Sequence, residues 1–116
     1  MIPKRRRPTK HNTGRGPLRC AGHLKFVRGF ECAIAGRNGH VCEGKIEACH
    51  VRNGTDGGTS LKPSDCFTIP LCSAAHRWQH MIGESAFELA TGIKMRGIAD
   101  ALWKRSPHRI KSERAA

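Results

Sequence analysis

The stretch FTIPLCSAAHRWQHMI, residues 67–82, predicts a short strand that runs directly into a helix. Its first five residues are apolar or β-favouring, and Pro70 restricts them to an edge strand or a strand end, because proline has no N–H to donate. Ser73 is a favourable helix N-cap, and the residues that follow it predict a helix. On that helix His76 and His80 lie one turn apart on the same face. The stretch therefore predicts a strand-to-helix unit that carries a histidine pair.

A second strand is expected upstream, over residues 45–51 (KIEACHV). The period-two alternation sends Cys49 and His50 to opposite faces, unless the strand ends or bulges there, and it turns His50 toward the helix histidines. Residues 53–65, between the two strands, form a long polar loop with several turn signals. A loop of that length in a small domain is more often functional than idle.

The other segments predict an α+β fold. Residues 84–90 extend or restart the first helix, and residues 95–104 have the apolar spacing of a final helix that Pro107 ends. Residues 18–34 are mixed but contain apolar anchors for the core, and residues 35–40 have the composition of a turn.

The chain of 116 residues carries a net charge of +12, which is unevenly distributed. Residues 1–30 contain nine Lys or Arg and no acidic residue, and residues 94–116 contain seven against two acidic residues. Residues 31–93 contain five basic residues against seven acidic ones. Basic flanks around a slightly acidic centre favour contact with the phosphates of a nucleic acid, although charged tails also serve solubility alone.

Composition divides the chain into three parts. Residues 1–17 are rich in Pro, Gly and basic residues and predict a flexible arm; residues 18–106 predict one domain; residues 107–116 predict a basic tail. No apolar run is long enough for a membrane span, and no apolar stretch follows the basic start as in a secretory signal. We therefore expect a cytoplasmic protein whose six cysteines favour metal binding over disulfides.

The histidines predict a hydrolytic metal site. His76 and His80 can share one divalent ion, since both imidazoles leave the same helix face. His50, at the end of the opposite strand, can act as a general base on water. Arg52, Lys62 and Arg77 are candidate contacts to the nucleic acid, and Arg52 or Arg77 would hold the phosphate under attack.

These residues resemble the HNH endonuclease family and its ββα-metal motif. The resemblance covers about residues 30–92 and rests on IEACHVRNGTDGG, KPSDCFTIPLCSAAHRWQH and GESAFE. The middle segment is especially similar to small phage and prophage HNH nucleases such as the Ref-like group. The family's fold would be a small ββα-metal domain, here with an additional C-terminal helix and basic arms.

The resemblance implies a metal-dependent DNA endonuclease, encoded by a phage or prophage and acting in the bacterial cytoplasm on double-stranded DNA. His50 corresponds to the general base, and His76 and His80 correspond to the helix ligands of the catalytic metal, which would be Mg²⁺, Mn²⁺, Ni²⁺ or Zn²⁺. The resemblance implies nothing about the oligomeric state.

Two residues depart from the family pattern. Cys49 stands where many members have an Asp or His ligand, and it would be a substitute ligand, a zinc thiolate or a packing residue. Phe67 stands where many members have an asparagine, and its side chain cannot form a hydrogen bond. Asp65 or the loop backbone is therefore expected to orient His50.

Many members also hold a structural zinc with two C-x2-C pairs, and here both pairs lack their second cysteine. Cys32, Cys42 and Cys72 are the best candidates for a displaced zinc site, with a fourth ligand from Cys49, Cys66 or a histidine. The alternative is that these thiols are buried packing residues.

Two other functions stay open. The departures at Cys49 and Phe67 favour a non-catalytic, zinc-stabilised nucleic-acid-binding module on the same scaffold. A ribosome-like RNA binder would explain the charge but not the spacing of the histidines.

Overall fold

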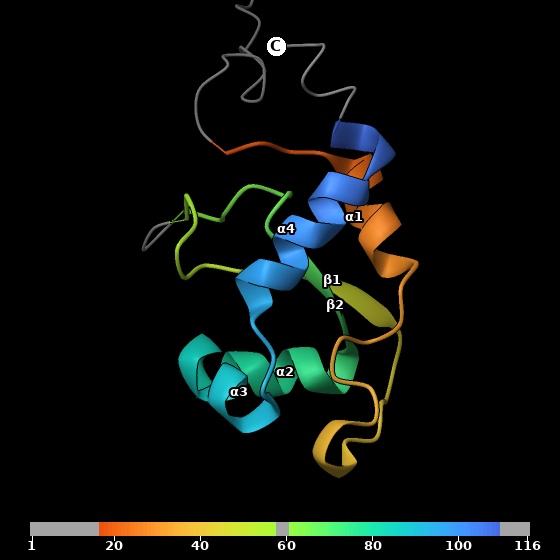
Figure 1. Cartoon of the computed structure of the whole chain (residues 1–116), viewed down its shortest axis with the longest axis vertical. Helices are drawn as coiled ribbons and strands as arrows, with labels where there is room; N and C mark the ends of the chain where they lie inside the picture. Colours follow the sequence, from red (N-terminus) through yellow and green to blue (C-terminus); the bar gives the residue numbers. More distant parts are fainter. Residues whose placement is uncertain (1–16, 58–60, 110–116) are drawn as a thin grey trace, which may run out of the picture.

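The computed structural model of the chain describes residues 17–57 and 61–109. In chain order the elements are α1 (Ala21–Arg28), the 3₁₀ turn η2 (Arg37–Gly39), β1 (Ile46–His50), β2 (Thr68–Cys72), α2 (Ser73–Ile82), α3 (Glu84–Thr91) and α4 (Met95–Arg105) (Figure 1). This order confirms the α+β class and the strand–strand–helix unit with a further C-terminal helix. The predicted arm and tail, residues 1–17 and 107–116, lie mostly outside the described residues.

The two strands form an antiparallel sheet, which is two-stranded in the described residues. Its register pairs Ile46 with Cys72 and His50 with Thr68. This pairing places the end of β1 beside the start of β2 and the start of β1 beside the first turn of α2. The sheet thereby brings His50 close to the loop that precedes β2.

Pro70 lies in the middle of β2, opposite Ala48. This position is compatible with the predicted edge strand. The carbonyl of Pro70 accepts a hydrogen bond from Ala33 N at 2.8 Å, on the side away from β1. An N–H at Pro70 would also have pointed away from β1, because both backbone groups of a strand residue point to the same side. The proline therefore costs the sheet no ladder hydrogen bond.

Helix α2 begins one residue earlier than predicted. The residue that caps it is Cys72, whose sulfur accepts a hydrogen bond from Ala75 N at 3.4 Å, so the prediction of Ser73 as the N-cap is wrong. The hydroxyl of Ser73 instead lies 3.2 Å from both the Lys45 carbonyl and a Glu47 carboxylate oxygen. Gly83, with φ of 88°, then ends α2, so the next helix restarts rather than continues it.

Helix α1 is an element that the sequence did not predict. Its buried residues, His23 and Val27, lie one turn apart. A histidine and the neighbouring Gly22 do not give the apolar pattern that predicts a helix packed on a core. The final helix was predicted closely, and it ends before extended Ser106. A further helical turn begins at Pro107, where a missing N–H costs nothing.

The strands lie between two pairs of helices (Figure 1). Helices α1 and α4 contact the strands on one side, and α2 contacts them on the other with α3 packed against it. The core between these layers is centred on fully buried Ile69, Leu71, Phe87 and Met95, and Cys49 is buried with them. Within the described residues, no helix is both long and apolar enough to cross a membrane.

Candidate active site and metal centres

The first candidate metal centre joins β1 and α2. A ring nitrogen of His76, a ring nitrogen of His80 and the sulfur of Cys49 all lie within 4.8 Å of one another. The two Nε2 atoms are 3.1 Å apart. Nitrogens that each bind a tetrahedral zinc ion at about 2.0–2.1 Å are about 3.3 Å apart, so the histidine pair fits a shared ion without rearrangement.

Glu47 determines which ring nitrogen of His76 carries the proton. One of its carboxylate oxygens lies 2.8 Å from Nδ1 of His76. A carboxylate only accepts hydrogen bonds, so Nδ1 carries the proton and the lone pair of Nε2 faces His80. The hydrogen bond from His76 lowers the pKa of Glu47 against an opposing effect of burial. A carboxylate behind a histidine in this way is the usual second partner of a metal-binding imidazole.

The strand alternates as predicted, but the face toward the helix histidines, where His50 was expected, is that of Cys49. It shares its strand face with Glu47, and both lie toward α2. Cys49 is also fully buried and packs in the core, and burial raises the pKa of its thiol to about 12. It is thus both a packing residue and a candidate ligand, and its thiolate needs a cation beside it to form.

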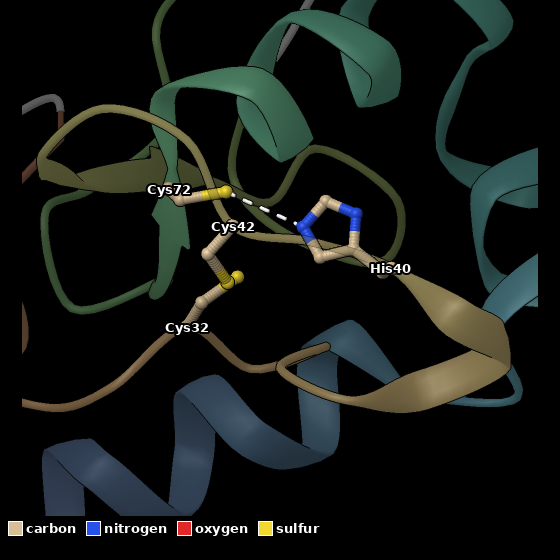
Figure 2. A group of neighbouring side chains, drawn as sticks. All are labelled: Cys32, His40, Cys42 and Cys72. Carbon is tan, nitrogen blue, oxygen red and sulfur yellow. Dashed lines mark hydrogen bonds between the residues drawn. The ribbon is translucent and has the colours of Figure 1, made fainter.

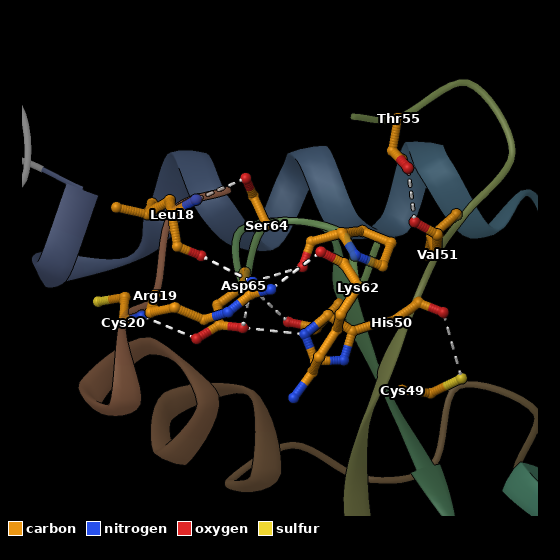
Figure 3. A network of polar contacts seen from close by, with 12 residues as sticks. Leu18, Arg19, Cys20, Cys49, His50, Val51, Thr55, Lys62, Ser64 and Asp65 are labelled. Atoms are coloured by element: carbon orange, nitrogen blue, oxygen red, sulfur yellow. Dashed lines mark hydrogen bonds and ion pairs between the residues drawn. The ribbon is translucent and has the colours of Figure 1, made fainter. Parts of the chain in front are cut away.

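His50 approaches the site from the other strand face. Its Nε2 lies 2.9 Å from Oδ1 of Asp65, so Asp65 is the orienting residue that the sequence offered in place of an asparagine (Figure 3). Burial lowers the pKa of His50, although the hydrogen bond to Asp65 raises it. Since Asp65 accepts the proton of Nε2, the lone pair of Nδ1 is available to take a proton at neutral pH.

Phe67 has a structural rather than a polar role at the asparagine position. Its backbone carbonyl accepts a hydrogen bond from Val51 N at 2.8 Å, which extends the sheet past His50. Its ring lies under the guanidinium of Arg96, 4.5 Å from the ring centre. The side chain therefore anchors the loop and α4 to the end of the sheet.

His50 and the helix histidines open onto one groove of about 980 Å³ between α1 and α2. Residues Ile46 to Ala48 of β1 form its floor. Its lining includes four basic side chains: Arg28, Lys45, Arg52 and Lys62. An adjoining hollow of about 570 Å³ is shared by His50, Arg52 and His80 and continues toward Glu84 of α3.

Two of the three predicted nucleic-acid contacts, Arg52 and Lys62, line this groove, whereas Arg77 is exposed on α2 and does not. Arg28 and Lys45 were not singled out from the sequence, because nothing in their local pattern distinguishes them from other surface cations. Glu84 fixes the loop beside the groove by accepting hydrogen bonds from the backbone N–H groups of Arg52 and Asn53 at 2.6 and 2.9 Å.

The second candidate metal centre lies at the other end of the sheet. Cys32, Cys42 and Cys72, the predicted trio, come together with His40, and the four ligand atoms lie within 4.8 Å of one another (Figure 2). The Nε2 atom of His40 is 3.4 Å from the sulfur of Cys72. A set of three cysteines and one histidine could hold a zinc ion, as in structural zinc sites.

Electrostatics already favour a thiolate in this cluster. Burial by itself would raise the pKa of Cys72, but hydrogen bonds from Ala75 N and His40 outweigh it and lower the pKa to about 6. Desolvation and hydrogen bonds to Cys32 and Cys72 raise the pKa of Cys42 to about 12. The cluster therefore concentrates negative charge on the buried sulfur that caps α2, where a cation would be favoured.

His40 is the fourth member that the sequence left unassigned. Its only signal was the His-x-Cys spacing with Cys42 beside a glycine-rich turn. Of the other two cysteines offered as the fourth ligand, Cys49 joins the first centre, and Cys66 belongs to neither group in the described part of the chain. The turn at η2 brings His40 back toward Cys72, which spacing alone could not predict.

Comparisons of the chain with models of protein families, with curated proteins and with solved structures found no match. The geometry of the two candidate centres and of the groove is therefore the basis for inferring the function.

Proposed function

We propose that the protein is a metal-dependent, HNH-type endonuclease that hydrolyses phosphodiester bonds of DNA. The observation that carries the proposal is one groove lined by the two histidines of a Cys–His–His metal group, by a histidine held by a carboxylate, and by four basic side chains. Phosphodiester hydrolysis needs a base for water, a charge beside the phosphate and a surface that holds the strand.

In this proposal His50 is the general base. The neutral ring, with Nε2–H donated to Asp65, takes a proton from a water molecule at Nδ1 and becomes a cation that the Asp65 carboxylate stabilises. The burial that lowers the pKa of His50 keeps it neutral and ready at physiological pH.

Cys49, His76 and His80 would hold the active-site ion, and Glu47 would orient His76 toward it. The ion would supply charge against the phosphate oxygen and the leaving oxygen. One sulfur and two imidazoles favour Zn²⁺ or Ni²⁺ over Mg²⁺, which prefers oxygen ligands. Of the metals that the sequence left open, we therefore favour zinc.

The basic side chains of the groove would hold the DNA backbone. Lys45 and Arg52 lie beyond opposite ends of β1, and Arg28 and Lys62 line the same groove, so a bound strand would place a phosphate near His50. Contacts of this kind bind phosphates without reading sequence. A phage or prophage origin and action in a bacterial cytoplasm belong to this proposal.

A plasmid-nicking assay tests it. The full-length chain, stripped of metal and then given Zn²⁺, Ni²⁺, Mn²⁺ or Mg²⁺, should nick supercoiled plasmid with at least one metal and lose activity with EDTA. His50→Ala should abolish nicking while DNA binding in a gel-shift assay is unchanged. A His50→Ala variant that nicks as well as the wild type would overturn the assignment of the base.

We also infer that Cys32, His40, Cys42 and Cys72 hold a structural zinc ion. Its support is the convergence of four residues from three segments, with His40 and Cys42 in the same one, beside the N-terminus of α2. If this ion is the only one that binds, the second candidate function, a zinc-stabilised nucleic-acid-binding module, is favoured. Metal analysis decides between them: we expect two zinc ions per chain for the nuclease and one for the binding module.

A further inference from the structure

Asp65 is more deeply buried than its place in a polar loop suggests. Its side chain is 4 % exposed and accepts hydrogen bonds on both oxygens. Oδ1 faces Nε2 of His50 at 2.9 Å and the guanidinium of Arg19 at 3.5 Å, and Oδ2 accepts from Cys20 N at 2.7 Å (Figure 3). Every one of these neighbours is a donor, as an ionised carboxylate requires when it is removed from water.

The partners of Asp65 come from a segment far away in sequence. Residues 18–20, which we call the strap, lie beside residues 62–65 (Figure 3). Asp65 N donates to the Leu18 carbonyl at 2.9 Å, and Leu18 N donates to Ser64 Oγ at 2.8 Å. The strap thereby holds the backbone of Asp65 and the side chain of Ser64 directly before it.

The side chain of Arg19 adds further contacts between the strap and the loop. Its guanidinium donates to the carbonyls of Pro63 and Lys62 at 2.7 and 2.9 Å while it faces Asp65. Three or more acceptors around one guanidinium fix both the side chain and the loop. The loop that contains Lys62, a side chain of the groove, is therefore held in place by the strap.

We propose that Asp65, held by the strap, is a positioning residue that fixes His50 as the Nε2–H tautomer, with Nδ1 available to the groove. The inference rests on the proposed function, and it extends the working site to residues 18–20, outside the strand–loop–strand–helix unit. Its physical basis is that a carboxylate only accepts hydrogen bonds, so no other neutral tautomer of His50 satisfies the 2.9 Å contact.

The direct test is the ¹⁵N NMR spectrum of His50 in the zinc-loaded, full-length protein at alkaline pH, where imidazoles are neutral. The wild type should show one tautomer, protonated at Nε2. In Asp65→Asn, one amide position becomes a donor, and since Cys20 N still needs the amide oxygen, the NH₂ group faces His50. The Nδ1–H tautomer should then appear.

The cleavage assay gives the second readout. Asp65→Asn should lower kcat by about 100-fold or more with little change in KM for DNA, because a misplaced tautomer in a comparable carboxylate–histidine pair costs about 10⁴-fold in kcat. Asp100→Asn, an exposed carboxylate paired with Arg96 at 2.9 Å, is the matched control and should keep full activity. Arg19→Met removes the guanidinium from the strap and should lower kcat by a smaller factor, which keeps the test usable if Asp65→Asn fails to fold.

One outcome would overturn the inference separately from the proposed function, and another would overturn both. An Asp65→Asn variant that retains both the Nε2–H tautomer and full kcat, while His50→Ala is inactive, would overturn the role of Asp65 and leave the nuclease assignment intact. A wild-type protein that nicks no plasmid with any metal would overturn both.

Discussion

At the scale of single residues, two carboxylates determine what the candidate active-site histidines can do. Glu47 holds Nδ1 of His76, and Asp65 holds Nε2 of His50. The two contacts use opposite ring nitrogens, so in the proposed site one imidazole would present Nε2 to a metal and the other would present Nδ1 to water. The division between a ligand and a base thus follows from which ring atom each carboxylate occupies.

Glu47→Gln should weaken metal binding at the active site by about 10–100-fold, the usual cost of losing a carboxylate behind a metal-binding histidine. Competition with a chromophoric chelator for Zn²⁺ or Co²⁺ would measure this. Glu31→Gln, an exposed carboxylate outside the groove lining, is the control and should bind metal like the wild type. Equal affinities for Glu47→Gln and the control would contradict the role of Glu47.

His23 makes the stability of the fold sensitive to acid. It is fully buried in α1, with Nδ1 2.9 Å from Ser106 Oγ and its ring against Trp103. Burial and the nearby His108 lower its pKa from 6.5, although Asp65 raises it. The unfolded chain then binds the proton more readily than the folded one, so stability falls as pH drops below about 6.5.

The free energy of unfolding, measured by urea titration at neutral and mildly acidic pH, should decrease less in His23→Gln than in the wild type. The substitution removes the titrating group but keeps a polar side chain near Ser106. Lys104→Gln, a surface control that does not titrate in this range, should follow the wild-type curve. Parallel pH curves for His23→Gln and the wild type would contradict the prediction.

At the scale of elements, Cys72 connects the two candidate metal centres. It is the last residue of β2 and the N-cap of α2, and His76 lies one turn further along the same helix. A zinc ion on Cys72 would fix the start of α2 and thereby the direction of both helix histidines. The active-site geometry would then depend on an ion at the opposite end of the sheet.

Cys32→Ser should therefore lose one zinc ion per chain and lower the Tm by roughly 10 °C or more, given about 4–8 °C per kcal/mol in a domain of this size. Atomic absorption and thermal unfolding would measure the two effects. Cys20→Ser, at a cysteine outside both groups of described ligands, should change neither. Unchanged zinc content in Cys32→Ser would exclude this ligand set.

At the scale of the whole molecule, charge is concentrated where the chemistry would take place. The described part of the chain places Arg28, Lys45, Arg52 and Lys62 around the histidines, although they come from an α-helix and two separate loops. Their summed field would attract a polyanion and orient it along the groove. The chain's net charge of +12 adds a general attraction that does not depend on this arrangement.

The salt dependence of DNA binding should report the contacts in the groove. Each phosphate contact contributes about 0.9 to the slope of log K against log salt, so Lys62→Ala should reduce the slope by about one. Fluorescence anisotropy with a labelled duplex would measure it. Lys104→Ala, which removes a cation outside the groove, should change the slope less. The slope for Arg77→Ala, measured in the same way, tests whether Arg77 contributes. Equal slopes for Lys62→Ala and Lys104→Ala would place the DNA elsewhere.

The sequence by itself determined the elements whose signals are local. The period-two pattern before His50, the proline of β2 and the one-turn spacing of His76 and His80 predicted both strands and α2, and apolar spacing predicted α4. Helix α1 was missed because its buried stripe includes a histidine, and the N-cap was placed one residue late because a thiolate took the role expected of Ser73.

Only the tertiary structure decided which side chains meet. The Cys32–Cys42–Cys72 trio was predicted, but the turn at η2 supplied His40, and the packing of α2 decided that the strand face of Glu47 and Cys49 lies toward the helix. Glu47 and the strap acquire their roles from contacts between residues 29 to 46 positions apart, and Arg28 reaches the groove from α1. Sequence patterns record the neighbours along a strand or helix, whereas these contacts depend on how the elements pack, which no local pattern encodes.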